Sequence, residues 1–178
     1  MYESGRGVAQ DFVEAVKWFR RAADQGHAGA QNNLGFMHAH GRGVPQDYDE
    51  AVTWFRRAAE QGHAGAQFNL GRRYAQGQGV PQNDTEAVKW FRRAAEQGFA
   101  DAQNDLGYMY AHGRGVPQDY VAAHTWFSLA ASRQQSGRTA RGLSKTGTLR
   151  QNRMTSAQIA EAQRFARDRR PKPEQPSQ

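Results

Sequence analysis

The sequence contains no cysteine, and it has no apolar run long enough to cross a membrane. Without cysteine, the chain cannot form disulfides, bind zinc through thiolates or use a thiolate nucleophile. A membrane-spanning helix needs about 20 mostly apolar residues, so we expect no membrane span. The first residues also lack the basic and apolar regions of a secretory signal peptide. We therefore expect a soluble protein of the cytoplasm, or of the periplasm or exterior if a signal peptide lies upstream.

Basic charge is confined to the C-terminal part of the chain. The formal net charge is +7. Residues 1–131 contain 13 Lys and Arg and 14 Asp and Glu, for a net charge of −1. Residues 132–178 contain 11 Lys and Arg and 3 Asp and Glu, for a net charge of +8. Nucleic-acid binding is therefore a hypothesis for the C-terminal segment alone, and the first 131 residues need another explanation.

Glycine, tryptophan and leucine recur with a period of 36 residues, and the register is kept through the first 131 residues. Such a period is typical of arrays in which each repeat buries its apolar face against its neighbours. The recurring positions are Gly5, Gly41, Gly77 and Gly113; Trp18, Trp54, Trp90 and Trp126; and Leu34, Leu70 and Leu106.

Each repeat predicts two helices, which we name the A helix (28–40 and its copies) and the B helix (47–61 and its copies). Apolar residues recur at helical spacing in both segments. Asp47 is placed to cap the B helix, and Glu50 three residues later resembles the second half of a capping box. Gly62 follows as a helix-ending residue.

Glycines in the middle of each A helix, at 35, 71 and 107, indicate close helix–helix approach, because glycine there costs about 1 kcal/mol relative to alanine. We expect the tryptophans to form the spine of the stacked repeats. The predicted fold class is all-α: an α-solenoid of 36-residue helix-turn-helix repeats.

The string GRGVPQDY, at 41–48 and again at 113–120, contains the Gly-x-Gly of many phosphate-binding loops. A phosphate loop follows a strand and usually carries a lysine and a hydroxyl residue. Here a predicted helix precedes the glycines, and Pro45 removes a backbone donor that a phosphate would use. We therefore interpret the string as a turn between two helices.

Histidines and serines do not form a recognisable catalytic or metal-binding pattern. No HExxH or GxSxG motif occurs. His38 and His40 are two residues apart, which places them on different faces of a helix. We predict no catalytic residue, no cofactor and no metal site.

The repeat resembles the Sel-one-like repeat (SLR) family, a 36-residue relative of the tetratricopeptide repeat. The matching motifs are A-x-x-x-L-G, G-x-G-V-P-x-D and A-V-x-W-F-x-x-A-A-E-Q-G. The resemblance implies an adaptor or scaffold that binds proteins or peptides rather than an enzyme. A cysteine-rich branch is linked to β-lactam binding or hydrolysis, which is a remote alternative here because the chain lacks cysteine. The residues that carry the match in one copy are Ala66, Leu70, Gly71, Gly77, Gly79, Val80, Pro81, Ala87, Trp90, Ala94, Ala95 and Gly98.

The repeat frame also predicts how the chain is divided. We expect a solenoid over 1–131, made of a half repeat and three full repeats. Met1 aligns with Met37, so the chain is expected to open within an A helix. We expect a basic loop or partly disordered insert over 132–153, a capping helix over 154–170 and a disordered tail over 171–178, because 132–153 has few apolar residues.

Some positions of the A helix differ between copies although the framework around them is identical. Aromatic, arginine and amide side chains of this kind anchor many protein interfaces. The alternative is that these are tolerated surface substitutions. The residues that we predict to bind a peptide or protein segment in a concave groove are Asn33, Phe36, Phe68, Asn69, Arg72, Arg73, Asp105 and Tyr108.

Two other basic features suggest further hypotheses. Residues 132–153 carry six basic and no acidic side chains, which would favour electrostatic binding to nucleic acid or to an anionic membrane surface. They lack the aromatics needed to stack on single-stranded bases, so we favour protein binding. The paired arginines of the B helices are expected to form a solvated face with ion pairs to Glu60 and Glu96.

Overall fold

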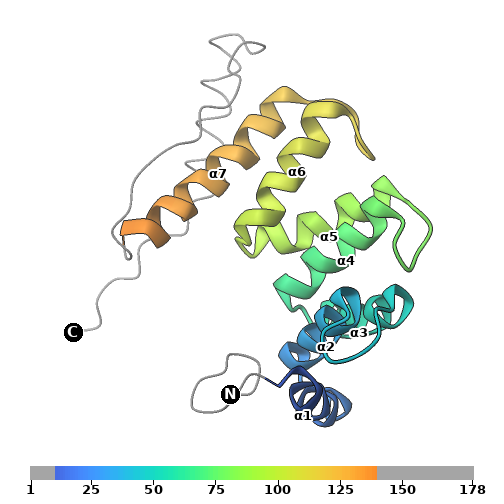
Figure 1. Ribbon diagram of the computed structural model, residues 1–178. Helices are drawn as coiled ribbons and strands as arrows, with labels where there is room; N and C mark the ends of the chain where they lie inside the picture. Colours follow the sequence, from blue (N-terminus) through green and yellow to red (C-terminus); the bar gives the residue numbers. More distant parts are fainter. Residues whose placement is uncertain (1–10, 140–178) are drawn as a thin grey trace.

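The computed structural model describes residues 11–139. Within this range every regular element is an α-helix, and short turns join the helices. The helices stack one after another into a curved array, an α-solenoid (Figure 1). The predicted fold class is confirmed. The helices are α1 (Phe12–Asp24), α2 (Ala28–His40), α3 (Tyr48–Glu60), α4 (Ala64–Gln76), α5 (Asp84–Glu96), α6 (Ala100–His112) and α7 (Tyr120–Thr139).

Local capping explains why the B helices begin where they do. The Asp47 carboxylate accepts a hydrogen bond from the backbone N–H of Glu50 at 2.9 Å, and α1 and α5 start in the same way. This pairs one of the N–H groups that a helix start leaves without a partner. The Glu50 side chain does not complete a capping box. Its carboxylate instead accepts from the Trp54 indole N–H at 2.8 Å.

The loop between the A and B helices contains two glycines with different roles. Gly77 ends α4 in the left-handed conformation, with φ 66°. Gly79 also has positive φ, and a Cβ added there would lie 2.2 Å from the carbonyl oxygen of Tyr48. Because Tyr48 begins α3, the second glycine lets the loop touch the B helix of the preceding repeat. The loop is therefore a turn, as predicted, and also a contact between repeats.

Glycines in the middle of the A helices receive a phenylalanine ring from the next B helix. A Cβ at Gly71 would lie 2.7 Å from the Phe91 ring, and a Cβ at Gly35 would lie 2.8 Å from the Phe55 ring. The predicted close approach of the helices is confirmed. These two rings are buried, so they contribute to the core at the helix–helix contact.

The tryptophans are less uniform than the period predicts. Trp54 and Trp126 are buried, Trp90 is partly buried, and Trp18 is 51% exposed. Trp54 packs in one cluster with residues of both α1 and α2, so this tryptophan is covered by the preceding helix pair. The prediction of a continuous tryptophan spine is therefore wrong at α1, where the structure describes no preceding pair.

Helix α7 continues past the predicted end of the solenoid. It runs to Thr139, whereas a loop was expected to begin at residue 132. Arginine and glutamine, which follow Ser132, are good helix formers, and each added residue gains a backbone hydrogen bond once a helix is started. The rest of the predicted insert, the predicted capping helix over 154–170 and the predicted tail over 171–178 lie outside the described residues.

Candidate protein-binding face

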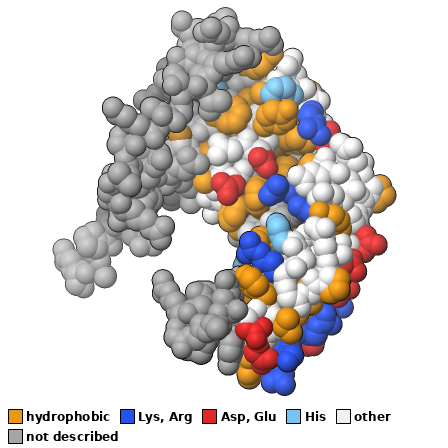
Figure 2. Space-filling model, viewed as in Figure 1, with side chains coloured by type: hydrophobic (Ala, Val, Ile, Leu, Met, Phe, Trp, Pro, Cys, Tyr) orange, Lys and Arg blue, Asp and Glu red, His pale blue; other side chains and the backbone are white. Residues whose placement is uncertain are grey.

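The variable side chains of the three A helices form what we call the A-helix face. Figure 2 shows that the array is hollowed on one side, where acidic, basic, histidine and hydrophobic side chains lie close together. Seven of the eight predicted binding residues are partly or well exposed, and these seven define the face: Asn33, Phe36, Phe68, Asn69, Arg72, Asp105 and Tyr108.

Amide side chains connect α2 to α4 across this face. The Asn69 amide donates from Nδ2 to Oδ1 of Asn32 at 3.0 Å. Asn32 in turn donates to Oδ1 of Asn33 at 3.5 Å. Two of the predicted residues, Asn33 and Asn69, therefore belong to one hydrogen-bonded row, and its amides are held in place by one another.

Aromatic rings near the ends of α2 and α6 are stacked on histidines. Phe36 and His40 have ring centroids 4.0 Å apart, and His40 donates from Nδ1 to the Phe36 carbonyl oxygen at 2.9 Å. Tyr108 and His112 repeat both contacts with the same distances. The stack holds the exposed Tyr108 ring in one orientation. The sequence signal for these histidines is an aromatic residue four positions before each of them.

Phe68 of α4 packs against aromatic rings of the next repeat. Its ring centroid lies 5.2 Å from that of Phe99 and 5.9 Å from that of Phe91. The Arg72 guanidinium lies over the same ring, 5.8 Å from the centroid. Phe68 is only partly buried, so it presents an apolar surface beside a cation.

Opposite charges lie near each other where α4 meets α6. Burial raises the pKa of Asp105 above its ordinary value, the positive charge of Arg72 lowers it, and the negative charge of Asp101 raises it further. The Asp105 carboxylate is therefore poorly solvated and only partly compensated. A donor from a ligand would stabilise its charged form.

Arg73 was predicted to bind a partner, but the structure places it inside the molecule. Its side chain is 8% exposed, and Met37 and Met109 are buried at the equivalent positions. The guanidinium lies over the Tyr48 ring, and Nη1 donates to the Gln78 side-chain oxygen. Its Nε has no hydrogen-bond partner. Burial lowers the pKa of Arg73. Arg73 is therefore a packing residue rather than part of the A-helix face.

A comparison of the repeats explains why an arginine occupies this buried position. In the first loop, Arg42 lies over Phe12, the first residue of α1. In the third loop, Arg114 pairs with Asp84, the first residue of α5, through two hydrogen bonds of 2.8 and 3.0 Å. The second loop has glutamine in that place, and Arg73 supplies the cation over the first residue of α3 instead.

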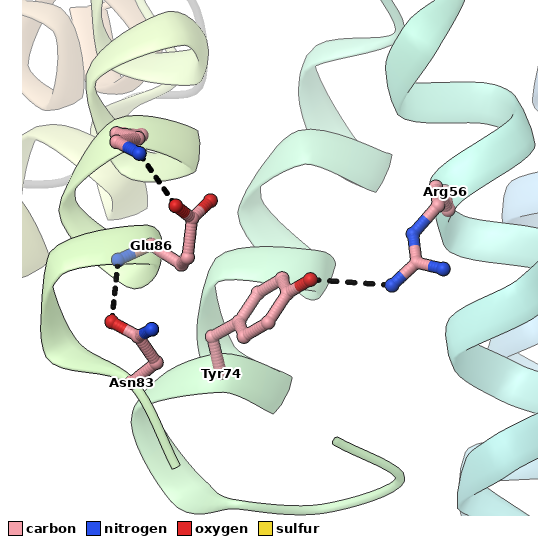
Figure 3. A network of polar contacts seen from close by, with 5 residues as sticks. Arg56, Tyr74, Asn83 and Glu86 are labelled. Carbon is pink, nitrogen blue, oxygen red and sulfur yellow. Dashed lines mark hydrogen bonds and ion pairs between the residues drawn. The ribbon is translucent and has the colours of Figure 1, made fainter. Parts of the chain in front are cut away.

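The paired arginines of the B helices contact aromatic side chains. Arg56 of α3 points toward Tyr74 of α4 and donates to its hydroxyl at 3.2 Å, and Asn83 caps the start of α5 nearby (Figure 3). Arg57 lies over the Trp54 ring, 4.8 Å from its centroid. In the part of the chain that is described, ion pairs involve other cations, so the predicted pairs with Glu60 and Glu96 are wrong.

Neither a metal-binding cluster nor a membrane-spanning helix occurs among the described residues. Among residues 11–139, no group of three His, Asp or Glu side chains is placed to hold a metal ion. In the same range, no helix is both long and apolar enough to cross a bilayer. His63 has a structural role, since its Nδ1 accepts from the backbone N–H of Ala66 at the start of α4.

Comparison with known families gives a match along most of the chain. No match was found among curated proteins. The family model described as Sel1 repeat matches residues 1–27, 28–63, 64–99 and 100–134.

Solved structures give matches of the same kind. The protective antigen c5321 of uropathogenic Escherichia coli strains, which displays an SLR fold, is 44% identical with a TM-score of 0.72, covering 80% of this chain and 32% of c5321. A Sel1 repeat protein from Oxalobacter formigenes is 40% identical with a TM-score of 0.68, covering 74% of this chain and 54% of that one. The chain thus spans about a third and about half of these two proteins.

A more distant structure shares the fold alone. Helicobacter pylori cysteine rich protein B is 20% identical with a TM-score of 0.56, and the alignment covers 78% of this chain and 99% of that one.

Proposed function

This chain belongs to the Sel1 repeat family, and we propose that it is a non-catalytic scaffold that binds a peptide or protein segment on its A-helix face. Sel1 repeat proteins are generally protein-interaction scaffolds. The proposed groove is the hollowed side of the array in Figure 2. Repeat arrays commonly use such extended concave surfaces for binding.

The observation that carries the proposal is the link between successive A helices. Asn69 of α4 is hydrogen-bonded to Asn32 of α2, and Arg72 of α4 interacts electrostatically with Asp105 of α6. These side chains stand on helices whose relative positions are held by buried packing, so the surface is organised before a partner arrives. Such preorganisation reduces the entropy that binding would otherwise cost.

Each kind of side chain supplies a different contact in this proposal. Asn33 and Asn69 hydrogen-bond the backbone of the partner, since an amide both donates and accepts. Arg72 donates to a carbonyl or carboxylate of the partner, and Asp105 accepts from its N–H groups. The aromatic residues provide apolar anchors, as aromatic residues often do in interfaces. They are Phe36, Phe68 and Tyr108.

Binding of selected peptides tests this proposal. Peptides are selected on the full chain from a random display library, and their affinity is measured by calorimetry for the unchanged chain and for Arg72→Ala/Tyr108→Ala. Because each anchor of this type contributes about 1–2 kcal/mol, we expect a loss of affinity of tenfold or more. The matched control, Arg92→Ala/Tyr110→Ala, removes the same residue types from a hydrogen-bonded pair that is not part of the A-helix face.

Two results would count against the proposed binding face. Circular dichroism establishes that each variant keeps its helices. Equal affinity of the folded Arg72→Ala/Tyr108→Ala variant and the unchanged chain would show that peptides bind elsewhere. Binding that is lost only on truncation after Thr139, and that falls steeply with salt, would instead favour the electrostatic hypothesis for the basic segment.

A further inference from the structure

The A-helix face changes the sign of its charge along the array. The first A helix with its following loop, 28–46, carries one arginine and no acidic residue, and the second, 64–82, carries two arginines and no acidic residue. The third, 100–118, carries two aspartates and one arginine. That arginine, Arg114, is paired with Asp84 of α5 at 2.8 Å. The face is therefore positive over α2 and α4 and negative over α6, and Figure 2 shows both signs of charge on the hollowed side.

Asp105 of α6 lies where the charge changes sign, and its carboxylate lacks the neighbour that its equivalent in α4 has. At the same position of α4, Asn69 donates to the Asn32 side chain across the face. Phe68 occupies the place of Asn32 in the next copy, so an aromatic ring replaces the amide that would pair with Asp105. Among residues 11–139 the Asp105 carboxylate has no hydrogen bond and no ion pair, and burial raises its pKa. The carboxylate is therefore available to accept donors from a partner.

Arg72 of α4 places a positive charge near this carboxylate. Its side chain is exposed and its guanidinium lies over the Phe68 ring, and its charge lowers the pKa of Asp105. The two charges do not form an ion pair, because the ion pairs in the described part of the chain involve other cations. A guanidinium has five N–H donors, and none of those of Arg72 is hydrogen-bonded to a described residue. Both charges are therefore open to a partner at one place on the face.

We propose that the segment bound on the A-helix face carries one basic and one acidic side chain close together, the basic one contacting Asp105 and the acidic one contacting Arg72. This inference rests on the proposed function and names the chemistry of the partner. A lysine or arginine supplies the donors that Asp105 lacks, and its methylene stem packs on Phe68. The carboxylate of the partner accepts two parallel hydrogen bonds from Arg72. A purely acidic segment would be repelled by Asp105, and a purely basic one by Arg72.

Double-mutant cycles between the peptide and the full chain test this proposal. Peptides are selected on the full chain from a random display library, and each charged residue of the most enriched peptide is replaced in turn by glutamine. Calorimetry then gives the affinity of each peptide for the unchanged chain, for Asp105→Asn and for Arg72→Gln. We expect loss of the basic side chain to weaken binding to the unchanged chain roughly tenfold, because hydrogen bonds to charged groups are strong. The same loss should have little effect on binding to Asp105→Asn.

The acidic residue of the peptide and a control variant complete the test. Loss of the acidic side chain should weaken binding to the unchanged chain to a similar extent and should have little effect on binding to Arg72→Gln. The matched control is Glu96→Gln, which removes an exposed carboxylate at the end of α5, outside the A-helix face. With this variant, the peptide should still lose roughly tenfold in affinity when its basic residue is replaced. Circular dichroism establishes that each variant keeps its helices.

Three results would overturn this inference. Selected peptides that lack either charge are the first, and an equal cost of removing the basic side chain with the unchanged chain and with Asp105→Asn is the second. The third is a dimer mass by light scattering that Asp105→Asn converts to a monomer, which would make a second copy the occupant. The proposed function survives the first two results if the peptides still lose affinity for Arg72→Ala/Tyr108→Ala. If no peptide is selected at all, the proposed function fails and this inference fails with it.

Discussion

Arg73 of α4 lies over the ring of Tyr48, the first residue of α3, with 5.3 Å between the guanidinium carbon and the ring centroid. The same junction between repeats is made by Arg42 and Phe12 in the first loop, and by Arg114 and Asp84 in the third. A cation over the start of the preceding B helix is therefore a common feature of all three junctions. Only in the second junction is the cation carried by an A helix, α4, rather than by the loop that follows it.

Replacing Arg73 should stabilise the fold, because its Nε is buried without a hydrogen-bond partner. Burying the guanidinium with one N–H group unpaired costs several kcal/mol, whereas the contact with Tyr48 contributes about 0.5–2 kcal/mol and the hydrogen bond to Gln78 about 1.5–3 kcal/mol. We expect Arg73→Met to raise the free energy of unfolding by roughly 1 kcal/mol, as measured by urea denaturation. The double variant Arg73→Met/Gln78→Arg returns the cation to the loop and should raise the free energy of unfolding further. A loss of stability in both variants would contradict this account.

The glycine in the middle of α4 should not tolerate a methyl group. A Cβ at Gly71 would approach the Phe91 ring to 2.7 Å, and overpacking of a core costs about 1–3 kcal/mol. We therefore expect Gly71→Ala to lower the free energy of unfolding by this amount. Gly29 in α2 has nothing within 4 Å of such a Cβ, so Gly29→Ala is the control. It should be neutral or stabilising by up to about 1 kcal/mol. Equal effects of both substitutions would contradict the packing argument.

The solenoid should lose stability in mild acid through His38. Burial lowers the pKa of His38 below 6.5, Arg20 lowers it further, and Glu50 and Asp47 partly oppose this change. Below pH 6.5 the unfolded chain therefore binds more protons than the folded one, so stability is full above the unfolded pKa and falls as the pH drops. Arg20 donates to Nε2 of the neutral ring at 3.4 Å, a contact that protonation would remove.

The variant His38→Tyr isolates this effect. Tyrosine occupies the equivalent positions in α4 and α6, where its hydroxyl accepts from Arg56 and Arg92. Urea denaturation at several values between about pH 5 and pH 8 should give a flatter stability profile for His38→Tyr than for the unchanged chain. Parallel profiles would assign the acid sensitivity to other groups.

Asp105 should be a destabilising charge in the absence of a partner. Its pKa is raised by burial, so the penalty is present above the unfolded pKa and is relieved as the pH falls. Asparagine fills this position in the first two copies, as Asn33 and Asn69. We expect Asp105→Asn to raise the thermal midpoint at neutral pH and to weaken the binding of selected peptides. A lower thermal midpoint would contradict the expected gain in stability. Unchanged peptide affinity would contradict the expected loss of binding.

Periodicity and capping predicted most of the fold. The 36-residue spacing and the residue types at the helix ends place α2 at Ala28–His40, the predicted segment, and place Asp47 as the cap of α3. Such features depend on a few neighbouring residues, so they can be predicted without the tertiary structure. The mid-helix glycines also predicted close packing correctly, although the phenylalanine that fills each gap was not identified.

Features that depend on the neighbouring repeat could not be predicted in the same way. Trp18 and Trp54 lie in nearly identical segments of sequence, but only Trp54 has a helix pair before it among the described residues. Arg73 occupies a variable position that faces inward, and its role depends on the glutamine at 78 in the next loop. Helix α7 runs to Thr139, past the predicted boundary at residue 132, because the good helix formers there can extend a helix that is already started.

Photo-crosslinking from the A-helix face tests the proposed function most directly. A benzophenone amino acid replaces Tyr108, which is 46% exposed on α6; in a second version of the chain it replaces Lys89, which is exposed on α5. Each version is irradiated with a peptide selected on the unchanged chain. The account predicts that crosslinks form from position 108, that excess unlabelled peptide competes them away, and that none form from position 89. Crosslinks from position 89 alone would contradict it.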